Sequence, residues 1–487
     1  MVNPEDAAPI LVLGGGCAGL AAGLRLARRG LPVVLVEQAD HVGGLAGGVR
    51  IGANVYEYGP HAFHTTDPEI LADVKDLMGA ELIEYRRTIK IRFLGKYFQF
   101  PLSMRDVLVR LPVGTVLRAG MSFAWHFSRG LFVRPAVETS ETLLTRYYGR
   151  VLYEIFFKSY IVKVWGISPA EFSPSFARER IPRLNVVRFL DRIWSAVKTR
   201  LRRRVSTEGY VEKVEGTLYT TRRGFSLITQ RMAERLETLG GRVLLNTRVV
   251  GLRREGAAIS AVDVSGPDGT VRRVACRAVV NTLPVNEVVR MVSPPLGSDV
   301  IAAAGQLRFR ALVFVGVLAR HPTALLSSFM YFREHSFNRV ADLSQFGFDV
   351  EPAGCTMLVA EVSCDTADRY WTDDAYAKQA VLDDLVRERI VEAGDVVEMH
   401  VFRAEHAYPV YTLDYERHRD LVLQAIARTA NMETAGRQGR FAYINTHIAM
   451  KMGYEAADRL MAGRKGHDDA TDPSAPTHPD THAGRRG

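Results

Sequence analysis

The chain has 487 residues, of which 47% are hydrophobic, and it carries 63 Lys and Arg against 54 Asp and Glu, a net charge of +9. Single hydrophobic cores stop growing near roughly 250–300 residues, so we expect two or three structural units. The hydrophobic content excludes a chain that is disordered throughout. The four cysteines are scattered and none has metal-ligand spacing, which argues against a disulfide framework and favours a reducing compartment.

Targeting and membrane-spanning signals are absent from the sequence pattern. The first ten residues, MVNPEDAAPI, lack the basic and apolar regions of a signal peptide. The most apolar stretch, residues 107–133, is interrupted by Arg110, Arg118 and Arg129, and no run reaches the ~18 residues of a spanning helix. We therefore expect a cytoplasmic protein, with peripheral attachment to the inner face of the membrane as an open alternative.

The positive charge is concentrated in one part of the chain. Residues 101–204 hold 19 Lys and Arg against 7 Asp and Glu, an excess of twelve that leaves the remainder slightly acidic. Concentrated positive charge indicates an anionic partner. The sequence leaves open whether this is a small anionic ligand or an anionic membrane contacted through residues 104–145 and 198–204; no nucleic-acid partner is expected.

The first elements predict a parallel α/β sheet. Residues 9–13 (PILVL) form a short apolar strand, and a glycine-rich turn follows at once. Residues 20–30 (LAAGLRLARRG) have a helical pattern that ends at a glycine, and residues 32–38 form a second buried strand. Strand, glycine turn, helix and strand in this order open a parallel sheet.

The rest of the chain changes character several times. Residues 102–204 show helical patterns rich in Arg and aromatic residues. Residues 215–300 again alternate between helix-like and strand-like segments, with a hairpin turn at Gly266-Pro267-Asp268-Gly269. Residues 305–405 contain alternating segments typical of an antiparallel sheet. A last helix is predicted at about 448–462, before a polar, disordered tail at 463–487 whose His467, His478 and His482 we interpret as solvated, with no metal site expected.

The glycine-rich turn is a candidate phosphate site. Gly14, Gly16 and Gly19 fit G-x-G-x-x-G between a strand and a helix, where backbone amides and the helix dipole can hold a pyrophosphate. Glu37 ends the next strand, 18 residues past Gly19, where a carboxylate can accept hydrogen bonds from ribose hydroxyls. Gly43-Gly44 follows six residues later.

This start resembles the FAD-binding module shared by amine oxidases, protoporphyrinogen oxidase, carotenoid desaturases and UDP-galactopyranose mutases. Residues 279–284 (VVNTLP) resemble a strand of the same module, and Gly436-Arg437 resembles the opening of its C-terminal flavin-contacting segment. The resemblance implies bound FAD. The residues that it implies for cofactor binding are Gly14, Gly16, Gly19, Glu37, Gly44, His61, His64, Val249, Gly436 and Arg437.

Three further stretches resemble the UDP-galactopyranose mutase branch. They are residues 58–65 (YGPHAFHT), residues 96–102 (KYFQFPL) and residues 156–166 (FFKSYIVKVWG). In that branch the first lies against the flavin, and the third supplies a Tyr that stacks on uracil and a Trp that borders the sugar, which correspond to Tyr160 and Trp165. An aromatic face suits this role because it stacks on a nucleobase.

Two arginines and two tyrosines match the residues that hold the diphosphate in the mutases. Arg180 and Arg310 correspond to the arginines, and planar guanidinium groups bind phosphate oxygens in bidentate fashion. Tyr408 and Tyr443 correspond to the tyrosines, and His447 is in register with a family His. The implied catalytic set is Arg180, Arg310, His64 and Tyr443, and the implied substrate-binding set is Tyr160, Trp165, Arg180, Arg310, Tyr408 and Tyr443.

The chain departs from the mutase pattern in two ways. Ile444 and Asn445 stand where the family has Tyr and Asp, and extra residues occur around 104–145 and 185–215. Other interpretations stay open: Tyr160 and Trp165 as core aromatics, His61 and His64 as structural histidines, and Arg178, Arg183 or Arg308 in place of the two chosen arginines.

The fold implied is α/β, with a discontinuous Rossmann-like FAD-binding domain, a helical domain and an antiparallel β-sheet substrate domain. The expected FAD-binding domain comprises residues 1–80, 215–300 and 425–462. The helical substrate domain with its mobile loop is expected at 102–210, and the antiparallel-sheet domain at 81–101 and 301–424.

The implied function is a flavin-dependent mutase that interconverts pyranose and furanose forms of UDP-galactose or a close analogue, through covalent catalysis by N5 of reduced flavin. The reduced cofactor requires an electron donor, for which NAD(P)H is a candidate. The alternative is an FAD-dependent oxidase or desaturase, similar to protoporphyrinogen oxidase, that acts on an apolar or membrane-held substrate. A non-catalytic flavoprotein is a third class, and the sequence leaves the oligomeric state open, a dimer included.

Overall fold

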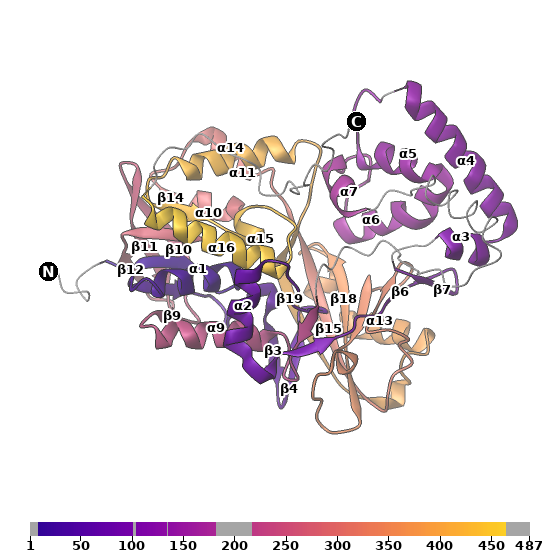
Figure 1. Cartoon of the computed structure of the whole chain (residues 1–487), viewed down its shortest axis with the longest axis horizontal. Helices are drawn as coiled ribbons and strands as arrows, with labels where there is room; N and C mark the ends of the chain where they lie inside the picture. Colours follow the sequence, from indigo (N-terminus) through magenta and orange to yellow (C-terminus); the bar gives the residue numbers. More distant parts are fainter. Residues whose placement is uncertain (1–7, 101–103, 134, 182–216, 464–487) are drawn as a thin grey trace, which may run out of the picture.

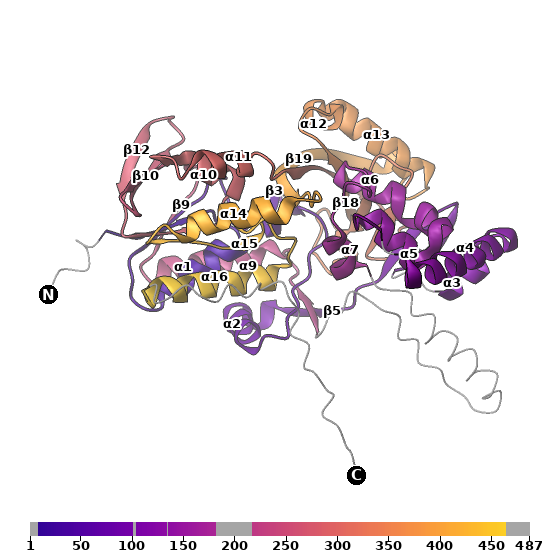
Figure 2. The same cartoon turned by 90° about the horizontal axis from the view of Figure 1, so that it is seen from above.

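The computed structural model describes residues 8–100, 104–133, 135–181 and 217–463 (Figures 1 and 2). The chain folds around a parallel sheet, a mixed sheet and a group of helices that lies beside the mixed sheet. Among the described residues, no helix combines the length and the apolar character needed to cross a membrane. Residues 198–204 and the tail from 464 onward lie outside the described part.

A five-stranded sheet is built from three distant parts of the chain. Its order is β20 (Met432–Thr434), β13 (Ala278–Asn281), β1 (Ile10–Leu13), β2 (Val33–Val36) and β9 (Arg242–Leu244), and all neighbours are parallel. Strands β1 and β2 are buried along their whole length, as expected when helices cover both faces of a parallel sheet. Both strands were predicted from their apolar runs.

Helices α1 (Cys17–Ala27), α9 (Ser226–Thr238) and α16 (Thr446–Met461) pack beside this sheet, and α1 contacts both of the others. Helices α1 and α16 were predicted to within a few residues. Gly453 of α16 lies against α1 so closely that a Cβ on it would be 2.2 Å from the carbonyl oxygen of Ala18. The last described helix therefore packs tightly on α1 beside the parallel sheet.

A four-stranded sheet adjoins the parallel one. Its order is β12 (Val271–Ala275), β11 (Ala258–Ser265), β10 (Arg248–Glu255) and β14 (Val292–Ser293). The predicted hairpin joins β11 to β12, and the Gly269 amide donates to the Gly266 carbonyl in its turn. Helices α10 (Val285–Met291), α11 (Ser298–Ala304) and α14 (Tyr415–Ala427) contact one another at this end of the molecule.

The seven-stranded sheet is mixed, whereas the sequence predicted an antiparallel one. Its order is β19 (Val396–Pro409), β15 (Phe309–Arg320), β18 (Cys355–Cys364), β17 (Arg339–Asp342), β16 (Phe329–Phe332), β6 (Ile89–Phe93) and β7 (Lys96–Gln99). Only β16 and β6 pair in parallel. The β6–β7 hairpin comes from far earlier in the chain, so no tight turn forces these two strands to run in opposite directions.

The long strand β15 separates two hydrophobic cores. Val313, Val315 and Val317 face the core under α13 (Asp374–Arg387) and the short α12 (Arg369–Thr372). Leu312 and Phe314 face the opposite side, toward the helices and the parallel sheet. One face of this sheet is therefore covered by its own helices, and the other is available to line a site.

The helices of the basic region form one group, as the sequence predicted. They are α3 (Met104–Arg110), α4 (Val113–Phe132), α5 (Ser140–Leu152), a π-helical turn (Tyr153–Lys158), α6 (Ser159–Trp165) and α7 (Pro174–Arg180). Apart from short 3-10 turns, the remaining described elements are β3 (Gly48–Ile51), β4 (Asn54–Glu57), α2 (Pro68–Met78), β5 (Ile83–Tyr85), β8 (Leu218–Thr220) and α15 (Gly436–Gly439). The predicted division into domains remains a proposal.

Candidate active site

Two glycines of the turn after β1, Gly14 and Gly19, leave no room for a side chain. Gly14 has a φ of +101°, and a Cβ on it would be 2.4 Å from Oγ1 of Thr282. A Cβ on Gly19 would be 2.0 Å from the Gly14 carbonyl oxygen. At Gly16 the nearest atom to such a Cβ is 4.0 Å away, the carbonyl oxygen of Gly43. The first and third glycines of the motif are therefore required for packing, whereas Gly16 keeps the backbone bare at the start of α1.

The start of α1 is suited to an anion. Gly16 precedes it without any side-chain cap, and no acidic residue lies in its first turn. The first amides of a helix have no partner within the helix, and its dipole favours negative charge there. These features suit the binding of a pyrophosphate at the start of α1.

Glu37 is fixed above this turn. Its Oε2 accepts a hydrogen bond of 2.7 Å from the Gly15 amide, and its Oε1 accepts one of 2.9 Å from the Ala39 amide. The Thr247 amide donates to the Glu37 carbonyl, and buried Val249 follows at the start of β10. Two of the predicted cofactor residues, Glu37 and Val249, thus lie near one another.

Two further glycines pack onto the turn from other segments. Gly43 donates its amide to the Gly15 carbonyl at 2.8 Å, and Gly44 follows with a φ of +55°. Gly436 has a φ of +82°, and a Cβ on it would be 2.9 Å from Cβ of Ala18. The structure therefore brings Gly14, Gly16, Gly19, Glu37, Gly44 and Gly436 together around one glycine-lined cradle, and this cradle fits the phosphates and ribose of a bound FAD.

The two histidines of the YGPHAFHT stretch, His61 and His64, are half-buried. Burial, together with the positive charges of Arg339 and Arg437, lowers the pKa of His61 to about 3. The rings of His64 and His447 are 4.8 Å apart, and burial with the charge of His64 lowers the pKa of His447 to about 4. His61 and His447 are therefore neutral at physiological pH and can shape a site without adding charge to it.

Glu57 was missed by the sequence analysis. Its side chain is fully buried at the end of β4, Oε1 accepts from the Ser226 amide at 3.2 Å, and Oε2 is 3.8 Å from Nδ1 of His61. Oε2 has no hydrogen-bond partner in the part of the chain that the structure describes. Burial raises the pKa of this carboxyl to about 8, so Glu57 holds a proton at neutral pH.

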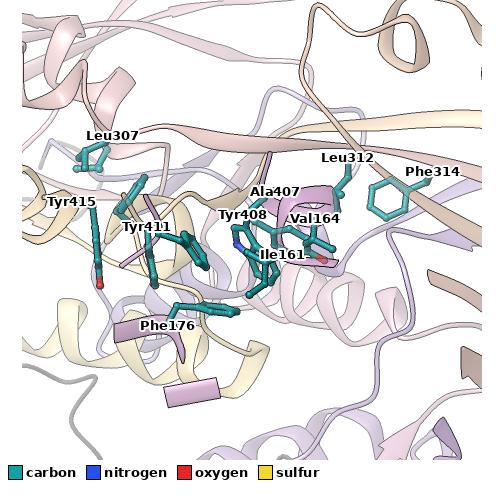
Figure 3. Close-up of a cluster of buried hydrophobic side chains, with 14 of the residues drawn as sticks. Ile161, Val164, Phe176, Leu307, Leu312, Phe314, Ala407, Tyr408, Tyr411 and Tyr415 are labelled. Atoms are coloured by element: carbon teal, nitrogen blue, oxygen red, sulfur yellow. The ribbon is translucent and has the colours of Figure 1, made fainter. Parts of the chain in front are cut away.

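Trp165, Tyr408 and Tyr443 form one aromatic cluster, part of which is seen in Figure 3. The ring of Trp165 is 4.5 Å from Phe176 and 6.4 Å from Tyr408, and Tyr408 is 5.3 Å from Tyr443. The Tyr443 amide donates to Oη of Tyr411 at 2.7 Å. Three predicted substrate residues from three distant segments are thereby in contact.

Tyr160 lies on the neighbouring side of this cluster. Its ring meets Tyr331 edge to face at 6.0 Å, and Tyr408 and Tyr443 are close enough to act on it electrostatically. Burial raises the pKa values of Tyr160 and Tyr408 well above their ordinary range. Both phenols are therefore neutral and able to donate hydrogen bonds.

Arg437 contacts the two tyrosines directly. Its guanidinium carbon is 5.0 Å from the centre of the Tyr443 ring and 5.7 Å from that of Tyr408. Nη2 donates to the Ile444 carbonyl at 2.6 Å. Ile444, which departs from the family pattern, is buried and positions Arg437 through its backbone; Asn445 precedes α16 without a side-chain cap.

Arg339 and Glu361 are a second feature that the sequence did not indicate. Nε of Arg339 donates to Oε1 of Glu361 at 2.8 Å, and the Arg339 guanidinium carbon is 5.9 Å from the centre of the Tyr331 ring. A Cβ on Gly59 would be 2.2 Å from the same Glu361 oxygen, so the YGPHAFHT stretch packs against this pair. Glu361 raises the pKa of Arg339 well above its usual value, which keeps this arginine charged.

Of the two arginines predicted to bind the diphosphate, the structure describes the side chain of Arg310 but not that of Arg180. Arg310 is buried on β15, where Nη1 is 2.5 Å from Oδ1 of Asp365 and where a Cβ on Gly166 would be 2.8 Å from the same nitrogen. It therefore lies next to Trp165, and it is opposite Tyr408 in the sheet register. Arg180 ends α7, and its side chain lies outside the described part, as does Arg183.

Lys163, in the FFKSYIVKVWG stretch, links α6 to the mixed sheet. Its Nζ donates to the carbonyls of His335 at 2.6 Å and Phe337 at 2.5 Å. Burial lowers the pKa of this ammonium to about 8. The lysine of this motif therefore fixes a loop, while the neighbouring Tyr160 and Trp165 face the aromatic cluster.

Among the described residues, no group of three or more His, Cys, Asp or Glu could hold a metal ion.

Comparison with known proteins agrees with this geometry. The flavin-containing amine oxidoreductase family matches residues 17–461. The chain is 30% identical over 179 residues to a probable UDP-galactopyranose mutase of Klebsiella pneumoniae and 26% identical over 176 residues to a dTDP-fucopyranose mutase of Escherichia coli. Each match covers 36% of this chain, and the chain spans less than half of either relative, 44% and 45%.

Solved structures extend the likeness to the whole fold. A reduced UDP-galactopyranose mutase superposes with a TM-score of 0.78 at 20% identity, over 94% of each chain. A putative protoporphyrinogen oxidase from Exiguobacterium superposes with a TM-score of 0.67 at 18% identity, over 94% of this chain and all of its own. At these identities the superpositions show the fold. Together with the family match, they show that the chain belongs to the flavin-containing amine oxidoreductase family and is an FAD-dependent enzyme.

Proposed function

We propose that this protein is a mutase that interconverts the pyranose and furanose forms of a nucleotide sugar, UDP-galactose or a close analogue. The observation that carries the proposal is the cluster of two half-buried arginines, Arg339 and Arg437, with the phenols of Tyr160, Tyr408 and Tyr443. An amine or hydrocarbon substrate does not require cations and hydroxyl donors in such a site, whereas a diphosphate does. The partial likeness to two sugar mutases supports the same conclusion.

When reduced FAD is bound, it supplies the nucleophile for the anomeric carbon, and the protein supplies binding and charge. Arg437 and Arg339 provide positive charge for the diphosphate that leaves the sugar and returns to it. Arg310 could join them by exchanging its bond to Asp365, a residue whose side chain is 67% exposed. Tyr408 and Tyr443 would donate hydrogen bonds to phosphate oxygens.

The other residues have simpler tasks in this proposal. Tyr160 would stack on the base, and Trp165 would border the sugar and exclude water from it. Neutral His61 and protonated Glu57 would leave the flavin side of the site without added charge, since neither residue is ionised at neutral pH. Charge in the site would then come from the arginines, from Glu361 beside Arg339, and from the cofactor.

The direct test uses purified protein reduced with dithionite and supplied with UDP-galactopyranose. We expect a furanose product by chromatography, and a change in the flavin spectrum on addition of UDP alone. The absence of both would refute the mutase proposal. Arg437→Lys should weaken the UDP response by removing a bidentate guanidinium, whereas Arg222→Lys, whose side chain is 70% exposed, serves as the matched control.

The role of Tyr160 can be tested with a matched pair. Tyr160→Ala should weaken UDP binding by about 1–3 kcal/mol, the range for aromatic–base stacking. Tyr160→Phe keeps the ring and should retain most of the affinity. Equal losses in the two variants would show that the hydroxyl, and not the stacked face, matters.

The second candidate is an oxidoreductase for an apolar substrate. The specific observation in its favour is the exposed apolar surface of α4. An enzyme that acts on a soluble nucleotide sugar does not require such a surface. If the oxidised enzyme loses its flavin absorbance on addition of an apolar substrate without any reductant, this alternative replaces the mutase.

A further inference from the structure

Helix α4 exposes a row of large apolar side chains. Five of them are more than 60% exposed. They are Val113 at 76%, Leu117 at 62%, Met121 at 67%, Trp125 at 65% and Phe132 at 86%. Single exposed apolar residues are ordinary on a protein surface, but a contiguous apolar patch marks an interaction site. We refer to these five residues as the α4 stripe.

The α4 stripe lies on one face of the helix. Its members are separated by four residues three times and then by seven, which places them within about 120° of the helix circumference. The opposite face contains buried Ala119, and Phe123 is so close to α5 that a Cβ on Gly149 would be 2.7 Å from its Cα. The helix therefore has its own core face, and the stripe is a second apolar face that points to solvent.

The charges around the stripe are positive. Helix α4 contains no Asp or Glu, and exposed Arg118 and Arg129 border the stripe. Neither arginine has an ion-pair partner among the described residues. Of the acids that flank α4 in the chain, Asp106 pairs with Arg110, and Glu138 pairs with basic side chains of its own helical group.

A flat partner can reach this surface. Figures 1 and 2 place α4 at the outer edge of the helical group, at the end of the molecule away from the parallel sheet. Its 20 residues form a rod of about 30 Å. In both views, no other described element lies farther out than α4 at this end of the molecule.

We propose that the α4 stripe docks this enzyme on the surface of an anionic membrane, with α4 lying along the interface. Val113, Leu117 and Met121 would enter the boundary between headgroups and acyl chains, and Trp125 would sit at headgroup depth, as interfacial tryptophans do. Arg118 and Arg129 would contact lipid phosphates. A second copy of the chain fits less well, because a two-fold contact through the stripe would bring the same unpaired arginines of both copies together.

The test is co-sedimentation of the FAD-loaded protein with vesicles. We expect binding to vesicles of equal parts phosphatidylglycerol and phosphatidylcholine, little binding to phosphatidylcholine alone, and weaker binding in 0.5 M salt. The double variant Arg118→Gln, Arg129→Gln should lower the partition coefficient roughly tenfold to thirtyfold, at about 1 kcal/mol for each cation. Met121→Glu should abolish sedimentation.

The control is Leu326→Glu, which adds the same charge at a residue that is 53% exposed on another part of the surface and should leave binding unchanged. Trp125→Phe should still sediment but lose most of the blue shift in tryptophan emission that vesicles produce. The proposal fails if the wild type does not sediment with anionic vesicles, or if Met121→Glu sediments equally well. It also fails if light scattering shows a dimer that Met121→Glu converts to monomers without any binding to vesicles.

Discussion

The protonated carboxyl of Glu57 leads to the most quantitative prediction, made with the variant Glu57→Gln. The amide has the shape of the neutral acid, and its oxygen can still accept from the Ser226 amide. It cannot ionise, so the variant imitates the form of Glu57 that the folded protein favours. Since Oε2 has no hydrogen-bond partner among the described residues, the substitution breaks no contact on that side.

The magnitude follows from the two pKa values of the carboxyl. In the unfolded chain it has a pKa of 4.5, and in the folded protein burial raises that pKa to about 8. Between these values the folded state holds one proton more than the unfolded state, so the free energy of unfolding falls as pH rises. At 1.36 kcal/mol per unit, ionisable Glu57 costs about 3 kcal/mol at pH 7 and about 5 kcal/mol above pH 8.5.

The assay is urea unfolding of wild type and Glu57→Gln at pH 5 and pH 8.5, with the same excess of FAD in every sample. We expect nearly equal stability at pH 5 and a variant that is more stable by several kcal/mol at pH 8.5. Glu84→Gln, at an exposed position on β5, should match the wild type at both values. If Glu57→Gln gives no gain at pH 8.5, the buried carboxyl is ionised in the folded protein and the reasoning is wrong.

Three further substitutions test the packing around the site. Gly19→Ala should yield protein that has lost most of its FAD, because the new Cβ would be 2.0 Å from the Gly14 carbonyl oxygen; the flavin-to-protein absorbance ratio measures this. Lys163→Met should lower the free energy of unfolding by about 2–4 kcal/mol, because buried carbonyls lose their charged donor. Phe314→Ala should lower it by about 3–5 kcal/mol, because a fully buried ring stacked on another aromatic is removed.

Each of these substitutions has a control at an open position. Gly394→Ala adds a methyl where nothing lies within 4 Å, and it should keep its FAD. Lys158→Met and Val271→Ala change exposed side chains and should alter stability by less than about 0.5 kcal/mol. Full FAD content in Gly19→Ala would contradict the close packing of the glycine turn. Unchanged stability in Lys163→Met or Phe314→Ala would contradict the packing around those side chains.

The nucleotide-binding part could be predicted because its signals are local. Gly14, Gly16 and Gly19 lie within six residues, and Glu37 follows at the end of the next strand, so spacing alone indicates the cradle. The hairpin at Gly266–Gly269 and the final helix were equally clear, since turn chemistry and helical periodicity are read within a short window.

The missed residues depend on distant partners. Arg339 and Glu361 occupy ordinary alternating positions in β17 and β18, and only the pairing of these strands places them opposite each other. Glu57 occupies such a position in β4, and its burial is produced by residues far along the chain, among them Ser226. The parallel pairing of β16 with β6 joins segments that are more than 200 residues apart, and no short pattern reports such a register.

The order of strands in the parallel sheet has a consequence for synthesis of the protein. Strand β1 lies between β2 and β13, and β13 in turn pairs with β20, which ends at residue 434. A growing chain therefore contains the glycine turn and Glu37 long before the strands that complete their sheet. Because distant pairings of this kind form late, FAD capture is expected to follow completion of the chain rather than to accompany its synthesis.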